Sequence, residues 1–277
     1  MASDPALTIN EAAQRLGVHY MTVYRYIRLG MLPARKEGSG WRIEAADLKR
    51  LDTSPSVPAR KRSAPWHTRL QARMLAGDEA GSWGVVEAAI GSGMEPRDFY
   101  CDVLTPVLHT IGELWQNGEI GVEEEHLASN VASAMIGRLG PRFASRGRNK
   151  GTVVMAMPAG EQHDLGVAML SDILRSDGYR VLNLGADTPA PALVAALREV
   201  DDLSALALSV VNSESLTTAA SLIEAVRQSI GAVPVLAGGA AVRDEQSAQR
   251  LGADGWAGDA REVGPIISAL ASTRGKP

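Results

Sequence analysis

The chain is poor in cysteine and lacks long hydrophobic runs. Its single cysteine, Cys101, excludes a disulfide within the chain and any zinc site built on cysteines. We interpret Cys101 as a small apolar residue of a helix. No apolar stretch is long enough to cross a bilayer, and no charged and then apolar leader opens the sequence. These absences predict a cytoplasmic protein with no membrane partner.

Charge is distributed unevenly along the 277 residues. Residues 1–62 carry 11 Lys and Arg against 6 Asp and Glu, whereas the remainder carries 17 against 26. The first part therefore has a net charge of +5 and the rest a net charge of −9. A basic small domain on an acidic body indicates that one end of the chain meets a polyanion, although exposed basic faces also occur without one.

A winged helix-turn-helix domain is predicted for residues 1–52. Thr8 and Glu11 have the spacing of a capping box at the start of a short helix. A second helix, from Met21 to Leu29, follows a glycine-containing turn. Residues 35–43 are predicted to form a two-stranded wing that turns on glycines, before a third short helix.

Residues 8–51 resemble the excisionase-type, MerR-related winged helix-turn-helix in the runs T-I-N-E-A-A-Q-R-L-G-V, T-V-Y-R-Y-I, G-M-L-P-A and G-W-R-I-E. The resemblance implies a recognition helix in the major groove of a double-stranded DNA operator and a wing on the DNA backbone or minor groove. Arginine and lysine bind phosphates, and arginine also bonds guanine edges. A small protein-interaction domain is the alternative. By position, the candidates for DNA contact are His19, Tyr20, Thr22, Tyr24, Arg25, Arg28, Arg35, Lys36 and Arg42.

Residues 65–148, which follow a basic, proline-containing linker (residues 53–64), have helical rather than strand patterns. We predict a four-helix bundle. At one end of it, Trp115 closes the third helix while Glu125 and His126 lie in the first turns of the fourth. A core tryptophan beside an acidic helix start is the alternative interpretation. The predicted helices cover residues 66–76, 82–89, 96–115 and 122–139.

Residues 149–277 alternate apolar runs with helical segments. This βαβ repetition predicts a doubly wound, Rossmann-like parallel sheet, with its ligand loops at the carboxyl ends of the strands. The fold class is thus multidomain, α followed by α/β. No convincing catalytic acid–base pair is present, so we do not expect an enzyme. The predicted strands cover residues 152–157, 180–184, 205–210 and 233–237, with a weak fifth near Gly255, and the helices lie near 164–176, 190–199, 215–230 and 243–251 and from Glu262 onward.

The loop after the first of these strands carries His163, where an open α/β sheet places its ligand. The motifs E-x-H-x-x-G from Glu161, S-x-V from Ser209 and G-G from Gly238 resemble those of the cobalamin-binding domain of B12-dependent mutases and methionine synthase. The resemblance implies that His163 binds cobalt as the lower axial ligand, that Glu161 orients it, and that the other motifs admit the nucleotide tail. The candidates for cofactor binding here are Glu161, His163, Asp164, Gly166, Ser209, Val211, Gly238 and Gly239.

Trp115, Glu125 and His126 have the Trp-x9-Glu-His spacing of the CarH/LitR-type B12-dependent photoreceptors. Those transcription factors have the same order of DNA-binding head, helix bundle and cobalamin domain. The resemblance implies that these three residues pack around the upper axial group of cobalamin, with adenosylcobalamin as the leading form. It also implies a repressor that is a dimer or tetramer, grips DNA in the dark and comes apart in light.

Gln116 departs from the photoreceptor pattern, in which a histidine follows the motif tryptophan and captures cobalt after photolysis. An amide is a poor cobalt ligand beside imidazole. The alternatives are therefore a regulator that senses cobalamin or another tetrapyrrole without light, and a corrinoid carrier for methyl transfer. A carrier has no need of a winged helix.

Overall fold

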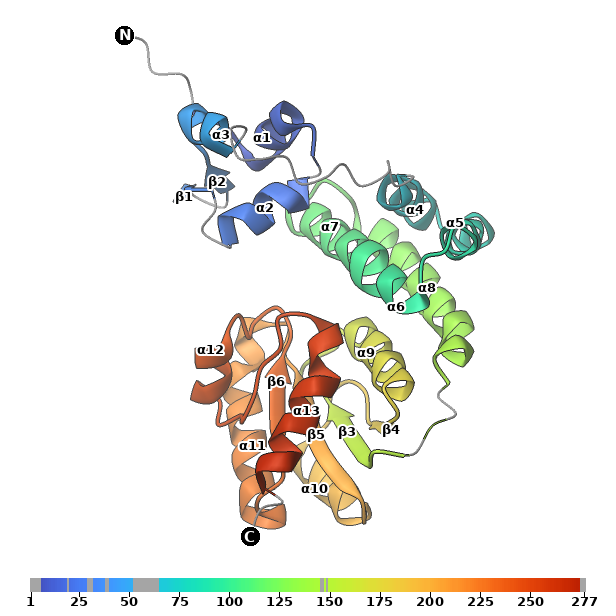
Figure 1. The fold of residues 1–277 in the computed structure, drawn as a ribbon, viewed down its shortest axis with the longest axis vertical. Helices are drawn as coiled ribbons and strands as arrows, with labels where there is room; N and C mark the ends of the chain where they lie inside the picture. The colour runs from blue at the N-terminus through green and yellow to red at the C-terminus, as the bar shows by residue number, and fades with distance from the viewer. Residues whose placement is uncertain are drawn as a thin grey trace. The chain divides into compact units, whose positions relative to one another are not determined.

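The computed structural model describes residues 6–18, 20–28, 32–37, 40–51, 65–144, 147 and 149–274. The chain divides into two compact units, residues 1–64 and residues 65–277. Each is described by itself, and Figure 1 shows the elements of both.

The first unit has the predicted winged helix-turn-helix fold. Thr8 and Glu11 form the predicted capping box, in which the Thr8 amide donates to the Glu11 carboxylate over 2.8 Å and the Glu11 amide donates to Thr8 Oγ1 over 3.2 Å. Buried Val23, Leu32 and Ile43 lie in its small core. Its elements are α1 (Ile9–Leu16), α2 (Tyr20–Arg28), β1 (Arg35–Glu37), β2 (Gly40–Arg42) and α3 (Ala45–Leu51).

The second unit begins with the predicted helix bundle. Its second helix is longer than the predicted residues 82–89, because Asp78 caps it three residues earlier by accepting from the Gly81 amide. The elements are α4 (Trp66–Leu75), α5 (Glu79–Gly91), α6 (Pro96–Phe99), the π-helical turn η1 (Tyr100–Leu104), α7 (Thr105–Gln116), α8 (Val122–Leu139) and the short η2 (Gly140–Phe143).

The predicted helical segment over residues 96–115 is confirmed, but the π-helical turn η1 lies within it. Pro106 explains the interruption. Its ring has no N–H and would collide with the carbonyl of Asp102 in a regular α-helix. A wider π-helical turn relieves that collision, and the Asp102 carbonyl accepts instead from Nε2 of His67 over 2.5 Å.

The α/β domain completes the second unit with a parallel sheet in the order β4-β3-β5-β6. The predicted fifth strand is reduced to a single bridge between Leu236 and Gly255. The elements are β3 (Thr152–Ala156), α9 (Leu165–Ser176), β4 (Arg180–Asn183), α10 (Ala190–Arg198), β5 (Leu203–Ser209), η3 (Ser213–Ser215), α11 (Leu216–Ile230), β6 (Val235–Gly238), α12 (Glu245–Arg250) and α13 (Ala260–Arg274).

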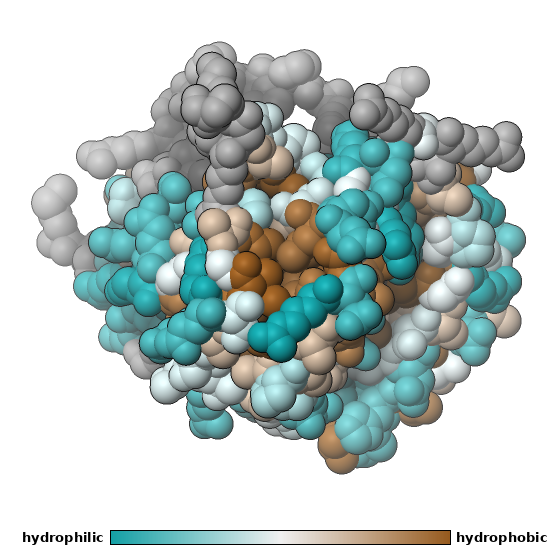
Figure 2. Space-filling model, turned by 90° about the horizontal axis from the view of Figure 1, so that it is seen from below, coloured by the Kyte–Doolittle hydropathy of each residue, from teal (hydrophilic) through white to brown (hydrophobic). Residues whose placement is uncertain are grey.

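Two apolar cores lie on the two faces of this sheet. Alternate residues of β3 supply them, with Val154 in the core under α10 and α11 and Val153 and Met155 in the core under α9 and α13. Figure 2 shows hydrophobic side chains gathered in the middle of one face with polar side chains around them. In the described part of the chain, no helix has the length and apolarity to span a bilayer.

A substitution at Gly239 tests whether the backbone at the carboxyl end of β6 requires glycine. Its φ of +99° suits only glycine, and an added Cβ would lie 2.4 Å from the Val210 carbonyl oxygen. We expect Gly239→Ala to lower the free energy of unfolding by about 1–3 kcal/mol in urea titrations. Gly238 has no atom within 4 Å of an added Cβ, so Gly238→Ala serves as the matched control. Equal losses in the two variants would contradict the strain argument.

Candidate functional site

The carboxyl edge of the sheet reverses its strand order between β3 and β5. The chain leaves β3 toward β4 on one side and returns to β5 on the other. The loops after β3 and β5 therefore diverge from the sheet at a topological switch point, where open α/β sheets bind ligands. His163 lies on the first of these loops.

Glu161 joins the two loops. Its carboxylate is buried, with 1% of the residue exposed. Oε2 accepts hydrogen bonds from the amides of Val211 and Asn212, at 2.9 and 2.7 Å, both in the loop after β5. Oε1 accepts from the Gln162 amide at 3.1 Å and contacts Nδ1 of His163 at 2.5 Å. One carboxylate thus fixes both loops and the imidazole.

This arrangement keeps the carboxyl group of Glu161 ionised and orients the ring of His163. Burial alone would raise the pKa of Glu161, but the bonds from His163, Asn212 and Val211 outweigh it and hold the pKa below its ordinary value. The ionised carboxylate accepts the proton of Nδ1, so a neutral imidazole carries its lone pair on Nε2. The side chain of His163 is 59% exposed. The site therefore presents an oriented imidazole with an available nitrogen.

The other predicted residues of this domain lie on the same edge. Ser209 ends β5 and Gly238 ends β6, and the two are paired in register. Val211 contributes its amide to Glu161, a role for its backbone that the sequence did not reveal. Asp164 and Gly166 are exposed where α9 begins, and space is open around Gly166. These residues leave room for a large ligand beside His163.

In the bundle, the junction of α7 and α8 exposes apolar side chains. Trp115 is 46% exposed and Val122 is 51% exposed, which is unusual for such large apolar groups. Glu125 accepts from Ser129 over 2.7 Å, and its other oxygen lies 3.8 Å from Nε2 of the largely exposed His126. The indole, carboxylate and imidazole thus lie at one end of the bundle, together with Val122, which the sequence interpretation missed.

One face of α7 turns toward the α/β domain. Thr105 in its first turn contacts the sulfur of Met169 on α9 at 4.0 Å. His109, Gly112 and Gln116 follow Thr105 at helical spacing, so they share that face. An added Cβ at Gly112 would meet no atom within 4 Å. Desolvation lowers the pKa of His109, and nearby Glu113 opposes this only in part.

The predicted DNA contacts are described only in part. Tyr20 packs partly against the core of the first unit, whereas Tyr24 is half-buried and lies outside that core. Arg35 pairs with Glu44 at 3.7 Å and Arg42 with Glu37 at 3.2 Å, and Lys36 is exposed. His19 and the side chains of Thr22, Arg25 and Arg28 lie outside the described residues.

Comparisons with known proteins agree with this division of the chain. Family models match residues 6–51 as a helix-turn-helix domain, and residues 66–139 and 151–265 each as a B12 binding domain. The HTH-type transcriptional repressor CarH of Myxococcus xanthus is 31% identical over 74% of this chain and 68% of its own length. The chain belongs to the CarH family of B12-binding transcriptional regulators. It is accordingly a DNA-binding regulator that binds cobalamin.

Two further likenesses bear on the CarH family assignment. The repressor CarA of the same organism is 27% identical over 98% of this chain and 99% of its own length, so the match includes the head. The monomethylamine corrinoid protein of Methanosarcina barkeri superposes with a TM-score of 0.65 at 19% identity, over 75% of this chain and 98% of that one. The second likeness shows the fold of the bundle and α/β domain.

Replacing Glu161 tests whether its carboxylate holds together the loops that follow β3 and β5. In Glu161→Gln, the amide group cannot accept from all the donors, so at least one buried N–H loses its partner. We expect a loss of about 1–3 kcal/mol in the free energy of unfolding, measured in urea without cofactor. Glu161→Asp keeps the charge and should lose less. Stability equal to the wild type in Glu161→Gln would contradict the role given to this carboxylate.

Proposed function

We propose that this chain is a cytoplasmic repressor whose hold on DNA is controlled by cobalamin bound between the bundle and the α/β domain. His163 would hold the cobalt, and Trp115, Val122, Glu125 and His126 would cover the bound cofactor from the bundle. The observation that carries this proposal is the exposed His163 imidazole, oriented by buried Glu161 at the switch point of the sheet.

The donor set fits the cofactor. Imidazole nitrogen is a good ligand for cobalt, so His163 would hold the metal of a bound corrinoid. When bound, the cofactor supplies a cobalt centre with an exchangeable upper ligand. Exposed Trp115 and Val122 offer an apolar cover for that upper face. Ser209, Val211 and the glycines after β6 line the same edge, in reach of a nucleotide tail.

In this proposal, the first unit binds the DNA operator. Arg35, Lys36 and Arg42 lie on a two-stranded wing, where basic side chains suit DNA phosphates. CarH and CarA are both repressors by name, which supports the same direction of control. We include a homo-oligomer in the proposal, since two-fold assemblies bind paired half-sites.

A corrinoid carrier for methyl transfer is the second candidate. A corrinoid protein of Desulfitobacterium hafniense is 25% identical over 73% of this chain and 95% of its own length. About a quarter of this chain has no counterpart there. The helix-turn-helix at residues 6–51 favours the regulator, because a carrier does not need to bind DNA.

His163→Ala tests the cofactor site. Loss of the axial nitrogen should weaken binding of hydroxocobalamin about 100-fold and change the visible spectrum of whatever remains bound. The neighbouring Gln162→Ala variant is the control and should bind normally. DNA affinity of the full chain, measured with and without hydroxocobalamin, should change in the wild type and in Gln162→Ala but not in His163→Ala. Normal binding by His163→Ala would contradict the lower-ligand assignment.

Gln116→His tests whether a side chain at position 116 can reach the cobalt of a bound corrinoid. An imidazole at this position, on the face of α7 turned to the α/β domain, can serve as a second axial ligand where the amide cannot. In the hydroxocobalamin-loaded variant, exchange of the upper ligand with added imidazole should slow at least tenfold (about 1.4 kcal/mol). Gln116→Asn should exchange like the wild type. Slow exchange already in the wild type would show that another residue fills the upper position.

A further inference from the structure

Side chains of one short segment of the bundle, residues 97–102, make several hydrogen bonds and ion pairs to the α/β domain. Arg97 donates to Ser176 Oγ over 2.6 Å and pairs with Asp177 at the end of α9. Tyr100 donates its hydroxyl to Asp172 over 2.9 Å. Arg261, at the start of α13, reaches the same segment from the other side. Both faces of the cofactor site depend on this interface for their separation.

One end of the interface is buried. Tyr100 is fully buried and stacks on Phe143, with ring centroids 4.9 Å apart. Asp172 is only 4% exposed and also accepts from Arg175. Burial, with the negative charge of Asp172, raises the pKa of Tyr100 well above its ordinary value, so the phenol stays protonated as the donor. Breaking this contact would remove a buried hydrogen bond and leave one oxygen of Asp172 without its donor, so we take this as the fixed end.

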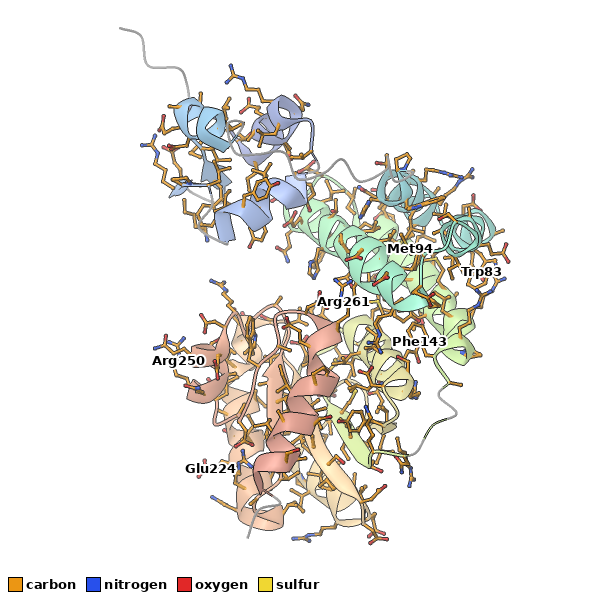
Figure 3. All side chains as sticks on the ribbon, in the orientation of Figure 1. Trp83, Met94, Phe143, Glu224, Arg250 and Arg261 are labelled. Carbon is orange, nitrogen blue, oxygen red and sulfur yellow. The ribbon has the colours of Figure 1, made fainter. Side chains whose placement is uncertain are left out.

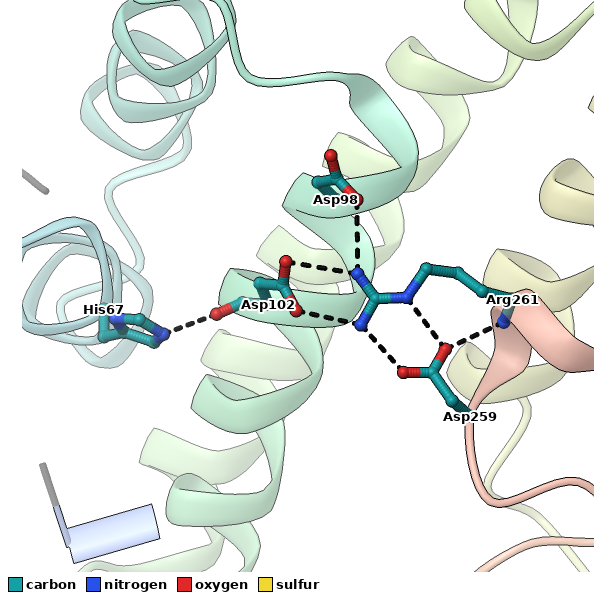
Figure 4. A network of polar contacts seen from close by, with 5 residues as sticks. All are labelled: His67, Asp98, Asp102, Asp259 and Arg261. Carbon is teal, nitrogen blue, oxygen red and sulfur yellow. Dashed lines mark hydrogen bonds and ion pairs between the residues drawn. The ribbon is translucent and has the colours of Figure 1, made fainter. Parts of the chain in front are cut away.

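The other end is a single guanidinium that serves three carboxylates (Figure 4). Arg261 binds Asp102 with both terminal nitrogens, at 3.2 and 3.0 Å, and Asp98 at 3.2 Å. Nε and one terminal nitrogen bind Asp259, at 3.0 and 2.7 Å. All five N–H groups of the guanidinium are thereby used. These bonds, first those to Asp259 and then those to Asp102, raise the pKa of Arg261.

This end is also accessible to water. The Arg261 side chain is 34% exposed, and those of Asp98 and Asp102 are 47% and 52% exposed. Ion pairs of this kind are individually weak and reversible. Helix α13 runs from the carboxyl edge of the sheet toward the amino edge, where its Ser268 meets Tyr179. The Arg261 contact therefore lies at the edge that carries His163, and the buried Tyr100 contact lies farther from it along the interface.

Building on the proposed function, we propose that Arg261 is a releasable latch that positions the bundle over the cofactor face. The contact between Tyr100 and Asp172 stays in place and acts as a hinge. When the ion pairs of Arg261 with Asp98 and Asp102 break, the bundle moves and the site admits cobalamin. Arg261 is a positioning residue: it acts through the bundle. Without it, Asp98, Asp102 and Asp259 repel one another across the interface, which favours the open arrangement.

Cys101 is a native reporter of this opening. It is the only cysteine of the chain and lies within residues 97–102, the segment that Arg261 contacts. Its thiol is half-buried and hydrogen-bonds Asp259. Burial, followed by the charge of Asp259, raises the pKa of the thiol to about 11, so it reacts slowly when the interface is closed. Opening should expose it.

The first experiment measures the rate at which a disulfide reagent labels Cys101 in the full chain without cofactor. We expect Arg261→Gln to react at least tenfold faster than the wild type and Arg261→Lys to lie between them. Loss of the Arg261 charge would by itself raise the thiol pKa and slow labelling, so the electrostatic effect opposes the predicted increase. Arg250→Gln, on α12, is the control (Figure 3). A wild-type rate in Arg261→Gln, with far-ultraviolet circular dichroism unchanged, overturns the latch.

The second experiment separates the latch from the cofactor assignment. Hydroxocobalamin should dissociate at least tenfold faster from Arg261→Gln than from the wild type, while the absorption signature of the bound form stays the same. Arg261→Lys should recover part of the difference. An unchanged dissociation rate contradicts the latch but leaves the cofactor site standing. If the wild type binds no hydroxocobalamin, the proposed function fails, and the labelling rates still decide whether Arg261 closes the interface.

Discussion

The buried carboxylate of Glu161 is the interaction on which the rest of the site depends. It accepts from two amides of the loop after β5 while it orients the imidazole on the loop after β3, so one group fixes both the switch point of the sheet and the proposed cobalt ligand. Taking such a charge out of water is costly unless every oxygen is satisfied. Here backbone amides and one imidazole satisfy it, and His163 gains a defined tautomer. The ligand loop is thus ordered before any cofactor arrives, which lowers the entropy that binding must overcome.

The bundle has a different part in the proposed site. Trp115 and Val122 leave apolar surface exposed at the α7–α8 junction, and we propose that this surface covers the cofactor. Residues 97–102, elsewhere in the bundle, contact the α/β domain. Tyr100 faces Asp172 and Asp102 faces Arg261, because residues two apart lie on opposite sides of a helix. The same short segment thus contacts both α9 and the start of α13.

The sequence predicted those parts of the molecule that local patterns determine. The capping box of Thr8 and Glu11 needs only three residues of spacing, and strand and helix periods located the doubly wound sheet. His163 and its loop followed from a motif. The contact between Arg261 and Asp102 could not be predicted from a motif, because the two residues are distant in sequence and charged residues of this kind are common. The hydrogen bonds that the amides of Val211 and Asn212 donate to Glu161 could not be predicted either, because backbone donors leave no pattern in the sequence. The π-helical turn did have a signal in the sequence, since Pro106 stands inside the predicted helix.

The most direct test of this account is the electron paramagnetic resonance spectrum of the cobalt(II) form of the loaded protein. A single axial nitrogen of ordinary isotope splits each cobalt line into three. If the protein is grown with histidine whose ring nitrogens carry the heavy isotope, the account predicts a change to two lines, because His163 is that nitrogen. The change should vanish in His163→Ala. Three lines from the labelled wild type would mean that the cofactor keeps its own base below the cobalt, and would contradict the central claim.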